Sequence, residues 1–428
     1  MSKAQPKFVT SFHWTSRSDV GMRRANNQDS CKIVLAEDES SWQQRGHLLI
    51  VADGMGAHAA GELASKLAVK TIPHLYYHDR ELAPRDALRS ALTQANVEIH
   101  RRGTANPDFQ GMGTTASVLA LLPQGAFVGH VGDSRVYRLR KGRLEQLTFD
   151  HSLLWEVRRS HRINEDSDFA KMIPKNVITR SLGPNSQVEV DIEGPFPLQK
   201  GDQFLICSDG LTGQIPDEEL AELMHELDPE EGAQLLVDLA NLRGGPDNIT
   251  LILVQLLDDR ILSEDHGTSS IQRSPRSDGL SWMATVAAPI AGVCLLFGVL
   301  LLFAGQTVVA GILTAAGVSV LIGAVIGWFR RRMIAQGHEA DGEGNAGQAP
   351  YAVCRCDHDG MMAETLSRTL DELRQAARDE NWNVSWQDID TLRDTAAKMT
   401  EARQYPDAIR QYAKAIRQMM QQLRKQSH

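Results

Sequence analysis

Cysteine is scarce in this sequence, and the few cysteines are scattered. The 428 residues include five cysteines, at Cys31, Cys207, Cys294, Cys354 and Cys356, which argues against a disulfide framework and favours a reducing compartment. A basic excess is also lacking: the net charge is −9, so nothing indicates nucleic acid as a partner. The N-terminal stretch MSKAQPKFVTSFHW has no apolar run of signal-peptide length, so we expect the N-terminal part in the cytosol.

Charge is absent from one long internal stretch. Residues 282–329 contain no Asp, Glu, Lys, Arg or His. As one helix they would run about 72 Å, more than twice a hydrocarbon core of about 30 Å. The stretch therefore predicts two transmembrane helices, about 283–304 and 307–329, although a buried hairpin in a soluble domain is an alternative. Arginines flank both ends of the stretch, at 273 and 276 and at 330–332, which predicts a two-pass inner-membrane protein with both flanks in the cytoplasm.

Composition divides the rest of the chain. Residues 1–258 alternate strand-like and helical patterns, 259–281 and 330–350 are polar, linker-like segments, and 351–428 form a predicted helical module. In that module, residues from about 361 to 426 are helical by period, with separate stretches over about 371–380, 386–402 and 406–425. This pattern is similar to one tetratricopeptide-type hairpin and equally to a small helical bundle. The cluster Cys354-Arg355-Cys356-Asp357-His358 has no second pair of zinc ligands, so chance is favoured over a metal site.

Residues 1–258 predict an α+β fold. Short glycine-containing turns join several strands directly, which favours antiparallel meanders with helices packed outside. The predicted strands are 48–52, 115–122, 126–132, 135–140, 203–207 and 249–257, and the predicted helices are 60–76, 84–102, 217–226 and 229–242.

Several of these strands end in an aspartate beside glycine. Asp53-Gly54 follows the run LLIVA, Asp209-Gly210 follows FLICS, and Asp133 follows the related run VGHVG. An isolated Asp-Gly pair is an ordinary turn signal. Recurrence at several strand ends instead suggests carboxylates that converge at one pole of a sheet, which is the oxygen-ligand arrangement that hard divalent cations need.

Further motifs complete an ordered series over residues 10–257. They are GMRRANNQD, VADGMGAHAAGE, GMGTTAS, HVGDSRVYRL, LTFDHSL, VITRSLG, LICSDGLT and GGPDNITLILV. With these motifs in this order, residues 10–257 resemble the metal-dependent serine/threonine protein phosphatases of the type-2C family, and the short spacings resemble those of bacterial members. The resemblance implies a central antiparallel β-sandwich flanked by helices.

The resemblance also implies roles for individual residues around two Mg²⁺ or Mn²⁺ ions. Asp53 would bridge both ions and the Gly54 carbonyl would complete one shell. Asp209 and Asp247 would hold one ion and Asp29 would act on the other. The two ions would activate a water that attacks phosphorus in line.

Two further roles come from the same resemblance. Arg24 lies five positions before Asp29, where the family has its phosphate-binding arginine, and a guanidinium matches phosphate oxygens in bidentate geometry. Asp133 resembles a ligand of a third, weaker metal, although its Gly-Asp-Ser-Arg setting also fits a hairpin turn.

Some positions depart from the family. Met55 stands where many eukaryotic members carry a proton-donating histidine, and Ala57 replaces a glycine. Gly213 replaces an acid that often supports the third metal, and His58 is expected to be a turn residue.

Residues 151–179 correspond to the family's flap beside the active site. Four of its basic residues would meet an acidic substrate segment or form a solvated helix face. They are Arg158, Arg159, His161 and Arg162.

The whole pattern predicts a membrane-anchored phosphatase acting on phosphorylated proteins, opposite a serine/threonine kinase. The alternative is a catalytically weak phosphatase-like scaffold that acts through its helical tail.

Overall fold

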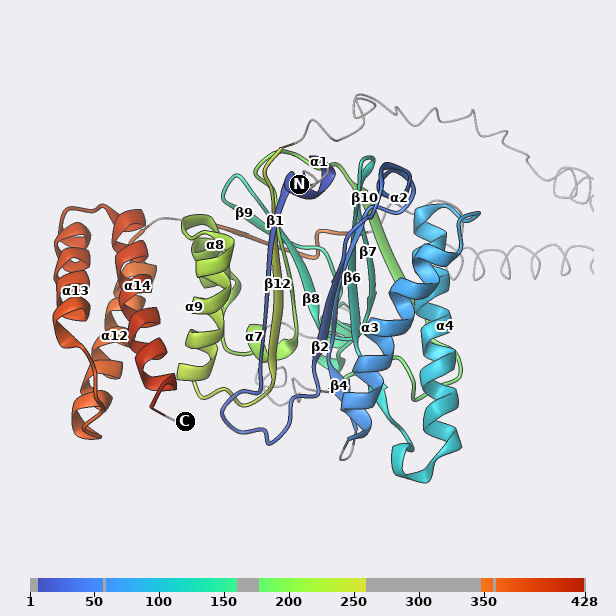
Figure 1. Ribbon diagram of the computed structural model, residues 1–428, viewed down its shortest axis with the longest axis horizontal. Helices are drawn as coiled ribbons and strands as arrows, with labels where there is room; N and C mark the ends of the chain where they lie inside the picture. Colours follow the sequence, from blue (N-terminus) through green and yellow to red (C-terminus); the bar gives the residue numbers. More distant parts are fainter. Residues whose placement is uncertain (1–6, 57–58, 160–176, 259–347, 357–358, 427–428) are drawn as a thin grey trace, which may run out of the picture. The chain divides into compact units, whose positions relative to one another are not determined.

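The computed structural model describes residues 7–56, 59–159, 177–258, 348–356 and 359–426. In this part of the chain, two antiparallel sheets pack face to face with helices outside them (Figure 1). The first sheet has the order β1-β12-β11-β8-β9-β13 and the second has the order β10-β7-β6-β3-β2. A short third sheet pairs β4 with β5. The predicted α+β class and antiparallel β-sandwich are thus confirmed.

The strands are short and mostly joined by tight turns or single helices. Their bounds are β1 Phe12–Asp19, β2 Ser30–Val34, β3 His47–Ala52, β4 Gly54–Met55, β5 Gly113–Thr114, β6 Ala116–Leu122, β7 Gly125–Val131, β8 Arg135–Arg140, β9 Arg143–Gln146, β10 Asp191–Phe196, β11 Gln203–Cys207, β12 Ile249–Leu256 and β13 Ala352–Arg355. The helices are α1 Lys7–Thr10, α2 Glu39–Gln44, α3 Ala60–His78, α4 Pro84–Ala105, η1 Pro107–Phe109, α5 Leu153–Arg159, α7 Asp209–Thr212, α8 Asp217–Glu226, α9 Pro229–Leu242, α12 Met361–Asp379, α13 Trp386–Glu401 and α14 Tyr405–Arg424.

Strand β3 shows why the central strands are continuous apolar runs. Every residue of β3 is buried. Leu48 and Ile50 face the core beneath α3 and α4, whereas Leu49 and Val51 face the core between the two sheets. Because both faces of a sandwich strand are covered here, the strand does not alternate between apolar and polar residues.

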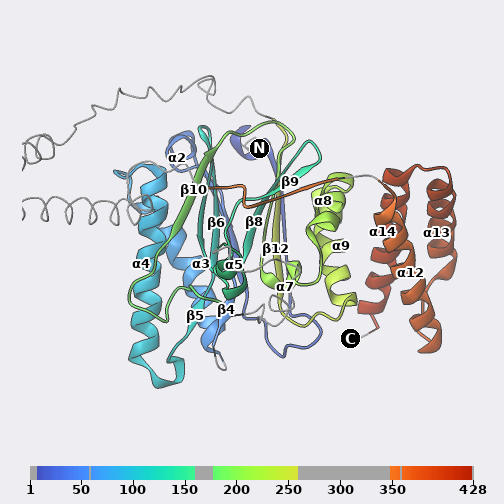
Figure 2. The same ribbon diagram turned by 180° about the vertical axis from the view of Figure 1, so that it is seen from behind.

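Helices cover the outer faces of both sheets (Figures 1 and 2). Helices α3 and α4 lie on the β10-β7-β6-β3-β2 sheet, and α8 and α9 lie on the other sheet. The predicted helices 84–102 and 229–242 agree closely with α4 and α9, and the predicted strand 203–207 is β11. Their apolar residues recur at the period of the observed element, which explains why the pattern located them.

The predicted membrane hairpin at 282–329 lies outside the described residues, so it stays a prediction. Among the helices that the structure does describe, none combines the length and the apolar character needed to cross a bilayer.

The C-terminal residues do not begin as the sequence pattern suggested. Residues 352–355, placed at the start of a helical module, form strand β13 and pair antiparallel with β9. The first helix, α12, starts at Met361, in agreement with the helical period predicted from about residue 361. Residues of α12, α13 and α14 share one hydrophobic core with α8, α9 and the adjacent sheet. The C-terminal residues thus pack as part of the same compact unit as the sandwich.

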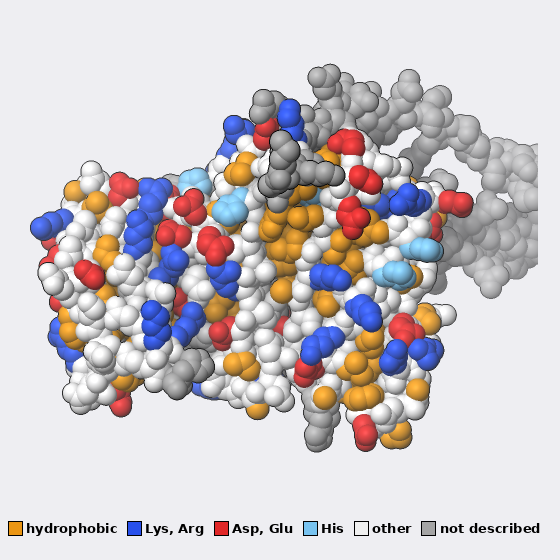
Figure 3. Space-filling model, viewed as in Figure 1, with side chains coloured by type: hydrophobic (Ala, Val, Ile, Leu, Met, Phe, Trp, Pro, Cys, Tyr) orange, Lys and Arg blue, Asp and Glu red, His pale blue; other side chains and the backbone are white. Residues whose placement is uncertain are grey.

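Three arginines on α14 form what we call the arginine ladder. Arg410, Arg417 and Arg424 are seven residues apart, a spacing that keeps them on one face of the helix. Arg410 pairs with Glu226 at 2.9 Å and Arg417 pairs with Glu231 at 2.8 Å. Arg424 pairs with Asp238. Figure 3 shows Lys and Arg side chains, with acidic side chains among them, over the region where α14 lies beside α9.

Candidate metal centre

The strand register brings the predicted carboxylates to one end of the sandwich. Asp53 follows β3, and Asp29 precedes β2, whose Ser30 pairs with Ala52 of β3. Asp209 lies just beyond β11, whose Cys207 pairs with Leu251 near the start of β12, and Asp247 precedes β12. Because neighbouring strands run antiparallel, these strand starts and strand ends lie at the same edge.

The backbone of Asp53 is held by the threonines of the GMGTTAS stretch. The Asp53 N–H donates to Thr115 Oγ1 at 2.9 Å, and the Asp53 carbonyl accepts from the Thr115 N–H at 2.8 Å. Thr114 Oγ1 also donates to that carbonyl, at 2.9 Å. Thr115 Oγ1 lies 2.7 Å from the Ser134 hydroxyl, beside Asp133. These side chains join the turns that carry Asp53 and Asp133.

Glycine is required after Asp53 because the chain is crowded there. A Cβ atom at Gly54 would lie 2.2 Å from the Gly61 carbonyl oxygen and 2.6 Å from that of Gln28. Both distances are below any van der Waals contact, so a larger residue would displace the backbone beside the carboxylates.

Asp29 and its loop are fixed by two side chains that sequence reasoning did not single out. Ser208 Oγ donates to Asp29 Oδ2 at 2.8 Å. Asn248 accepts from the Gln28 N–H at 2.8 Å and donates to the Val20 and Asn26 carbonyls at 2.8 and 3.0 Å. Both residues adjoin predicted ligands in the stretches LICSDGLT and GGPDNITLILV, which is the signal that could have found them.

Burial and mutual repulsion raise the pKa of the clustered carboxyl groups. Burial raises the pKa of Asp29 to about 6, and Asp209 and Asp247 add to the effect. Burial raises the pKa of Asp53 well above its usual range, with contributions from Asp29, Asp209 and Asp133. Burial and the charges of Asp209 and Asp150 raise the pKa of Asp133 to about 8. A cation bound among these groups would favour their ionised forms.

The donor set fits a hard divalent cation by type and by burial. One carboxylate oxygen each of Asp29, Asp133 and Asp209 is buried without a hydrogen-bond partner. Such orphaned oxygens are costly unless something else binds them. Within the described residues, however, no three His, Cys, Asp or Glu side chains are close enough together to enclose one ion. The structure thus brings the predicted carboxylates together without forming a closed coordination shell.

Arg24 lies at the open side of this cluster. Its Nη2 is 2.7 Å from Asp247 Oδ2, and its side chain is half exposed. The structure therefore brings the predicted phosphate-binding arginine next to a predicted metal ligand, with part of the guanidinium facing solvent.

A cavity of about 530 Å³ opens beside Arg24. Asp133, Asp209 and Asp247 line one part of it, and helix α5 contributes Leu154, Trp155 and Arg158. Asp29 and Asp53 do not line this cavity. Of the basic flap residues predicted to meet substrate, Arg158 reaches the cavity, whereas His161 and Arg162 lie outside the described residues. Trp155, which also lines the cavity, was not singled out from the sequence.

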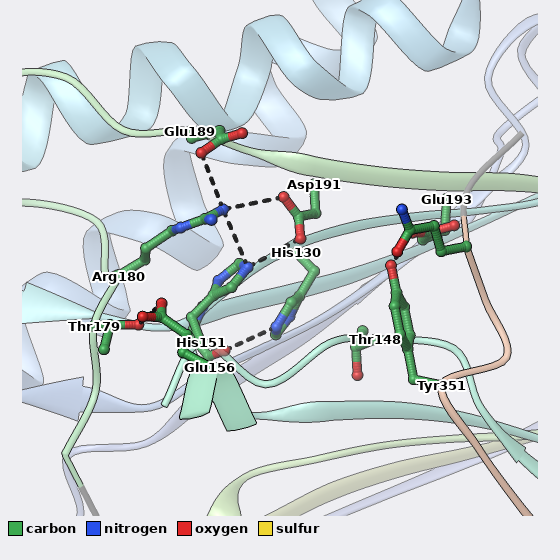
Figure 4. A network of polar contacts seen from close by, with 12 residues as sticks. His130, Thr148, His151, Glu156, Thr179, Arg180, Glu189, Asp191, Glu193 and Tyr351 are labelled. Carbon is green, nitrogen blue, oxygen red and sulfur yellow. Dashed lines mark hydrogen bonds and ion pairs between the residues drawn. The ribbon is translucent and has the colours of Figure 1, made fainter. Parts of the chain in front are cut away.

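A polar network surrounds the buried His151, which lies near Arg180 and Asp191 (Figure 4). The Gly132 N–H donates to His151 Nδ1 at 3.0 Å, so the other ring nitrogen, Nε2, donates to Asp191 at 3.0 Å. Arg180 also reaches Asp191, at 3.3 Å. His151 lies two residues before α5, so this network fixes where the helix begins.

The residues that depart from the family are placed as follows. Met55 lies in β4, paired with Gly113. Gly213 lines the cavity, four residues beyond Asp209. Ala57 and His58 lie outside the described residues. Cys354 lies in β13 and Cys356 directly follows it, while Asp357 and His358 of that cluster also lie outside the described residues.

Known protein phosphatases are similar to this chain in sequence and in fold. The protein phosphatase 2C family model matches residues 22–240. A "Putative protein phosphatase 2C-type" of Streptococcus pyogenes is 38% identical over 242 residues, which cover 56% of this chain and 95% of the relative. The "Serine/threonine phosphatase stp" of Listeria monocytogenes is 35% identical over 249 residues, covering 57% of this chain and 96% of the relative. The solved structure of the Mycobacterium tuberculosis serine/threonine phosphatase PstP/Ppp is 34% identical, covers 58% of this chain and 99% of that one, and has a TM-score of 0.50.

Proposed function

Because the chain belongs to the protein phosphatase 2C family, we propose that it is a membrane-anchored enzyme that hydrolyses phosphoserine and phosphothreonine in proteins. Its class is that of a serine/threonine protein phosphatase, as in the Listeria relative. One observation carries the proposal: carboxylates from separate strands meet at one edge of the sandwich, and three of their buried oxygens have no hydrogen-bond partner. An aspartate-rich edge of this kind has no structural use that would offset its cost.

Two Mg²⁺ or Mn²⁺ ions are the cofactors that this donor set suits. Asp53, the Gly54 carbonyl, Asp29, Asp209 and Asp247 would hold them. Asp133 would hold a third, weaker ion. When bound, the ions would supply an activated water and would stabilise negative charge at phosphorus.

Side chains around the cavity would bind the substrate. Arg24 would bind the phosphate of the substrate, because its guanidinium presents parallel N–H donors to two phosphate oxygens. On substrate binding, Arg24 would either leave Asp247 for the phosphate or contact both groups at once. Trp155 and Leu154 would contact the peptide around the phosphorylated residue, and Arg158 would favour acidic residues there.

Hydrolysis of p-nitrophenyl phosphate by the full-length protein tests the proposal. We expect turnover that requires Mn²⁺ or Mg²⁺ and that falls at least about 100-fold in Asp53→Asn, since this substitution removes a charged donor from the centre of the cluster. The matched control is Asp86→Asn, on an exposed position of α4. A folded wild-type protein that binds Mn²⁺ without turnover would favour the alternative function, a phosphatase-like scaffold that acts through its C-terminal helices.

Membrane anchoring is a second part of the proposal. It is supported by the 48 uncharged residues 282–329 and by the arginines on both flanks. The pairing of β13 with β9 adds support, because it keeps residues 352–355 on the same side as the sandwich. A chain that crosses the membrane between residues 258 and 352 must then cross it an even number of times, as the proposed hairpin does. Recovery of the full-length protein in the soluble fraction of lysed cells would contradict anchoring.

An anchored phosphatase would act on proteins at the cytoplasmic membrane surface, opposite a serine/threonine kinase. Phosphoproteomics of cells that carry Asp53→Asn, compared with wild type, would identify the substrates. Phosphosites that accumulate on membrane proteins are the expected result.

A further inference from the structure

Residues 348–355, which we call the return segment, lie against the loop that leads into α5. We propose that Tyr351 of the return segment is a positioning residue that holds α5 at the wall of the substrate cavity and thereby sets the affinity for phosphoprotein substrates. The inference rests on the proposed function, since it concerns the same cavity. The family model matches residues 22–240, so the return segment lies beyond the part that the model covers.

Tyr351 is anchored at both its backbone and its side chain (Figure 4). The Tyr351 N–H donates to the Gln146 carbonyl at 2.9 Å, directly before the pairing of Ala352 with Gln146. Its hydroxyl donates to Glu193 Oε1 at 2.5 Å. Glu193 is buried, with 5% of its surface exposed, so this hydrogen bond satisfies a carboxylate that water does not reach freely.

Two aromatic contacts connect the Tyr351 ring to the wall of the cavity. Its ring centroid lies 5.5 Å from that of Phe149, and the planes are tilted by 62°. Phe149 in turn meets Trp155 edge-on, at 5.4 Å and 89°. Trp155 lines the cavity. Edge-to-face packing at these distances is favourable and directional, so the position of Tyr351 is transmitted to the cavity wall.

A second contact joins the return segment to α5 directly. The Arg159 guanidinium lies 5.1 Å from the Phe149 ring centroid. The same side chain donates to Gln348 Oε1 at 3.3 Å. The last residue of α5 therefore contacts both Phe149 and the first residue of the return segment.

Trp155 is supported on its other side by the sandwich itself. The Arg135 guanidinium carbon lies 5.7 Å from the Trp155 ring centroid, and Arg135 is bound to Asp150 at 2.7 Å. Without the Tyr351 ring, Phe149 would be less firmly held. Trp155 would then be supported mainly by Arg135. The indole would then sample several positions at the cavity wall.

The expected consequence depends on the size of the substrate. A small phosphate ester needs only Arg24 and the carboxylate cluster, whereas a phosphoprotein segment also needs the wall formed by α5. Loosening that wall should therefore weaken binding of a phosphopeptide more than binding of a small ester.

The test compares a phosphothreonine peptide with p-nitrophenyl phosphate in the full-length protein with Mn²⁺. We expect Tyr351→Leu to raise KM for the peptide about 3- to 10-fold, the range that corresponds to one lost aromatic contact, and to raise KM for the small ester less than about 2-fold. Tyr351→Phe keeps the ring and should give a smaller rise. Val353→Thr, on an exposed position of the same return segment, is the matched control. Phe149→Leu should add little to Tyr351→Leu, because both substitutions break the same series of contacts.

Amide hydrogen exchange supplies a readout that a purely structural role would not move. Exchange in residues 153–159 should accelerate in Tyr351→Leu, while exchange in α9 stays unchanged. Equal changes in KM for both substrates, or unchanged exchange in α5, would overturn the proposal. Absence of any turnover by the wild type would instead refute the proposed function, and the exchange experiment would still decide the role of Tyr351. Should Tyr351→Leu fail to fold, Tyr351→Phe and Phe149→Leu carry the same comparison.

Discussion

The arginine ladder predicts that Arg424→Gln destabilises the protein in a pH-dependent way. Arg424 pairs with Asp238, of which 1% is exposed. The neutral amide of Gln234 also donates to this carboxylate, at 3.1 Å. Burial raises the pKa of Asp238 to about 6, even though the charge of Arg424 lowers it. Removing the guanidinium therefore leaves a buried carboxylate whose hydrogen bond from Gln234 is uncharged and whose pKa is still lowered by the charge of Arg417.

The expected loss follows from the burial of the two partners. Removal of one partner of a fully buried ion pair costs about 3–5 kcal/mol. The Arg424 side chain is 43% exposed, so water replaces part of its effect, and we expect a loss of about 1.5–3 kcal/mol at pH 8. The loss shrinks in acid, because Asp238 can take up a proton instead of remaining charged without a partner.

The sign of the pH dependence is set by the direction of the shift. The folded state binds the Asp238 proton more tightly than the unfolded state, whose ordinary pKa is 3.8. The burial of Asp238 therefore opposes folding at high pH. This destabilisation disappears as the pH falls from about 6 toward 3.8. Arg424→Gln raises the pKa of Asp238 in the folded state further. The pH range over which stability falls with rising pH therefore extends to higher pH.

Thermal unfolding of the full-length protein in detergent at pH 8 and pH 5 measures the effect. We expect Tm to fall by roughly 3–6 °C at pH 8 and by less than about half of that at pH 5. Arg424→Gln combined with Asp238→Asn should recover most of the loss, since no buried charge remains. Lys414→Gln, which removes a positive charge from the same helix, is the matched control. Equal losses at both pH values, or a double variant as unstable as the single one, would refute the reasoning.

Three further predictions concern the site and the core. Chelation of divalent ions by EDTA should abolish hydrolysis of p-nitrophenyl phosphate, and Mn²⁺ in excess should restore it; turnover that persists in EDTA would exclude metal dependence. Arg24→Lys should raise KM for a phosphate ester about 10-fold in steady-state assays, because an ammonium cannot replace the bidentate guanidinium; an unchanged KM would place phosphate binding elsewhere. Trp42→Ala should lower the free energy of unfolding in urea by about 3–5 kcal/mol, since Trp42 is 1% exposed and stacks on Phe8 at 5.9 Å; a loss below 1 kcal/mol, within what surface substitutions cost, would contradict this packing.

The sandwich and its strands were accessible from the sequence because their signals are local. The apolar run before Asp53 and the helical period over α9 each lie within one element. The predicted carboxylates could be named for the same reason, since each lies in a short motif at a strand end. Local patterns record the type of a side chain and the period of its element, which suffices for fold class and for a list of candidates.

The C-terminal return strand could not be predicted in this way. Residues 352–355 pair with residues 143–146, and no pattern within either stretch specifies the other. A four-residue edge strand followed by a long helix was therefore assigned to the helical module. The contact series from Tyr351 through Phe149 to Trp155 has the same character, because its three residues come from separate segments.

By itself, the sequence determined the family, the α+β class and the ordered set of Asp29, Asp53, Asp209 and Asp247, because these depend on residue types in local motifs. Only the tertiary structure decided that Arg24 pairs with Asp247, which carboxylate oxygens stay unpaired, and that residues beyond the family's part of the chain support the cavity wall. These features depend on distances between segments far apart in the sequence, and such distances are set by the packing of the whole core.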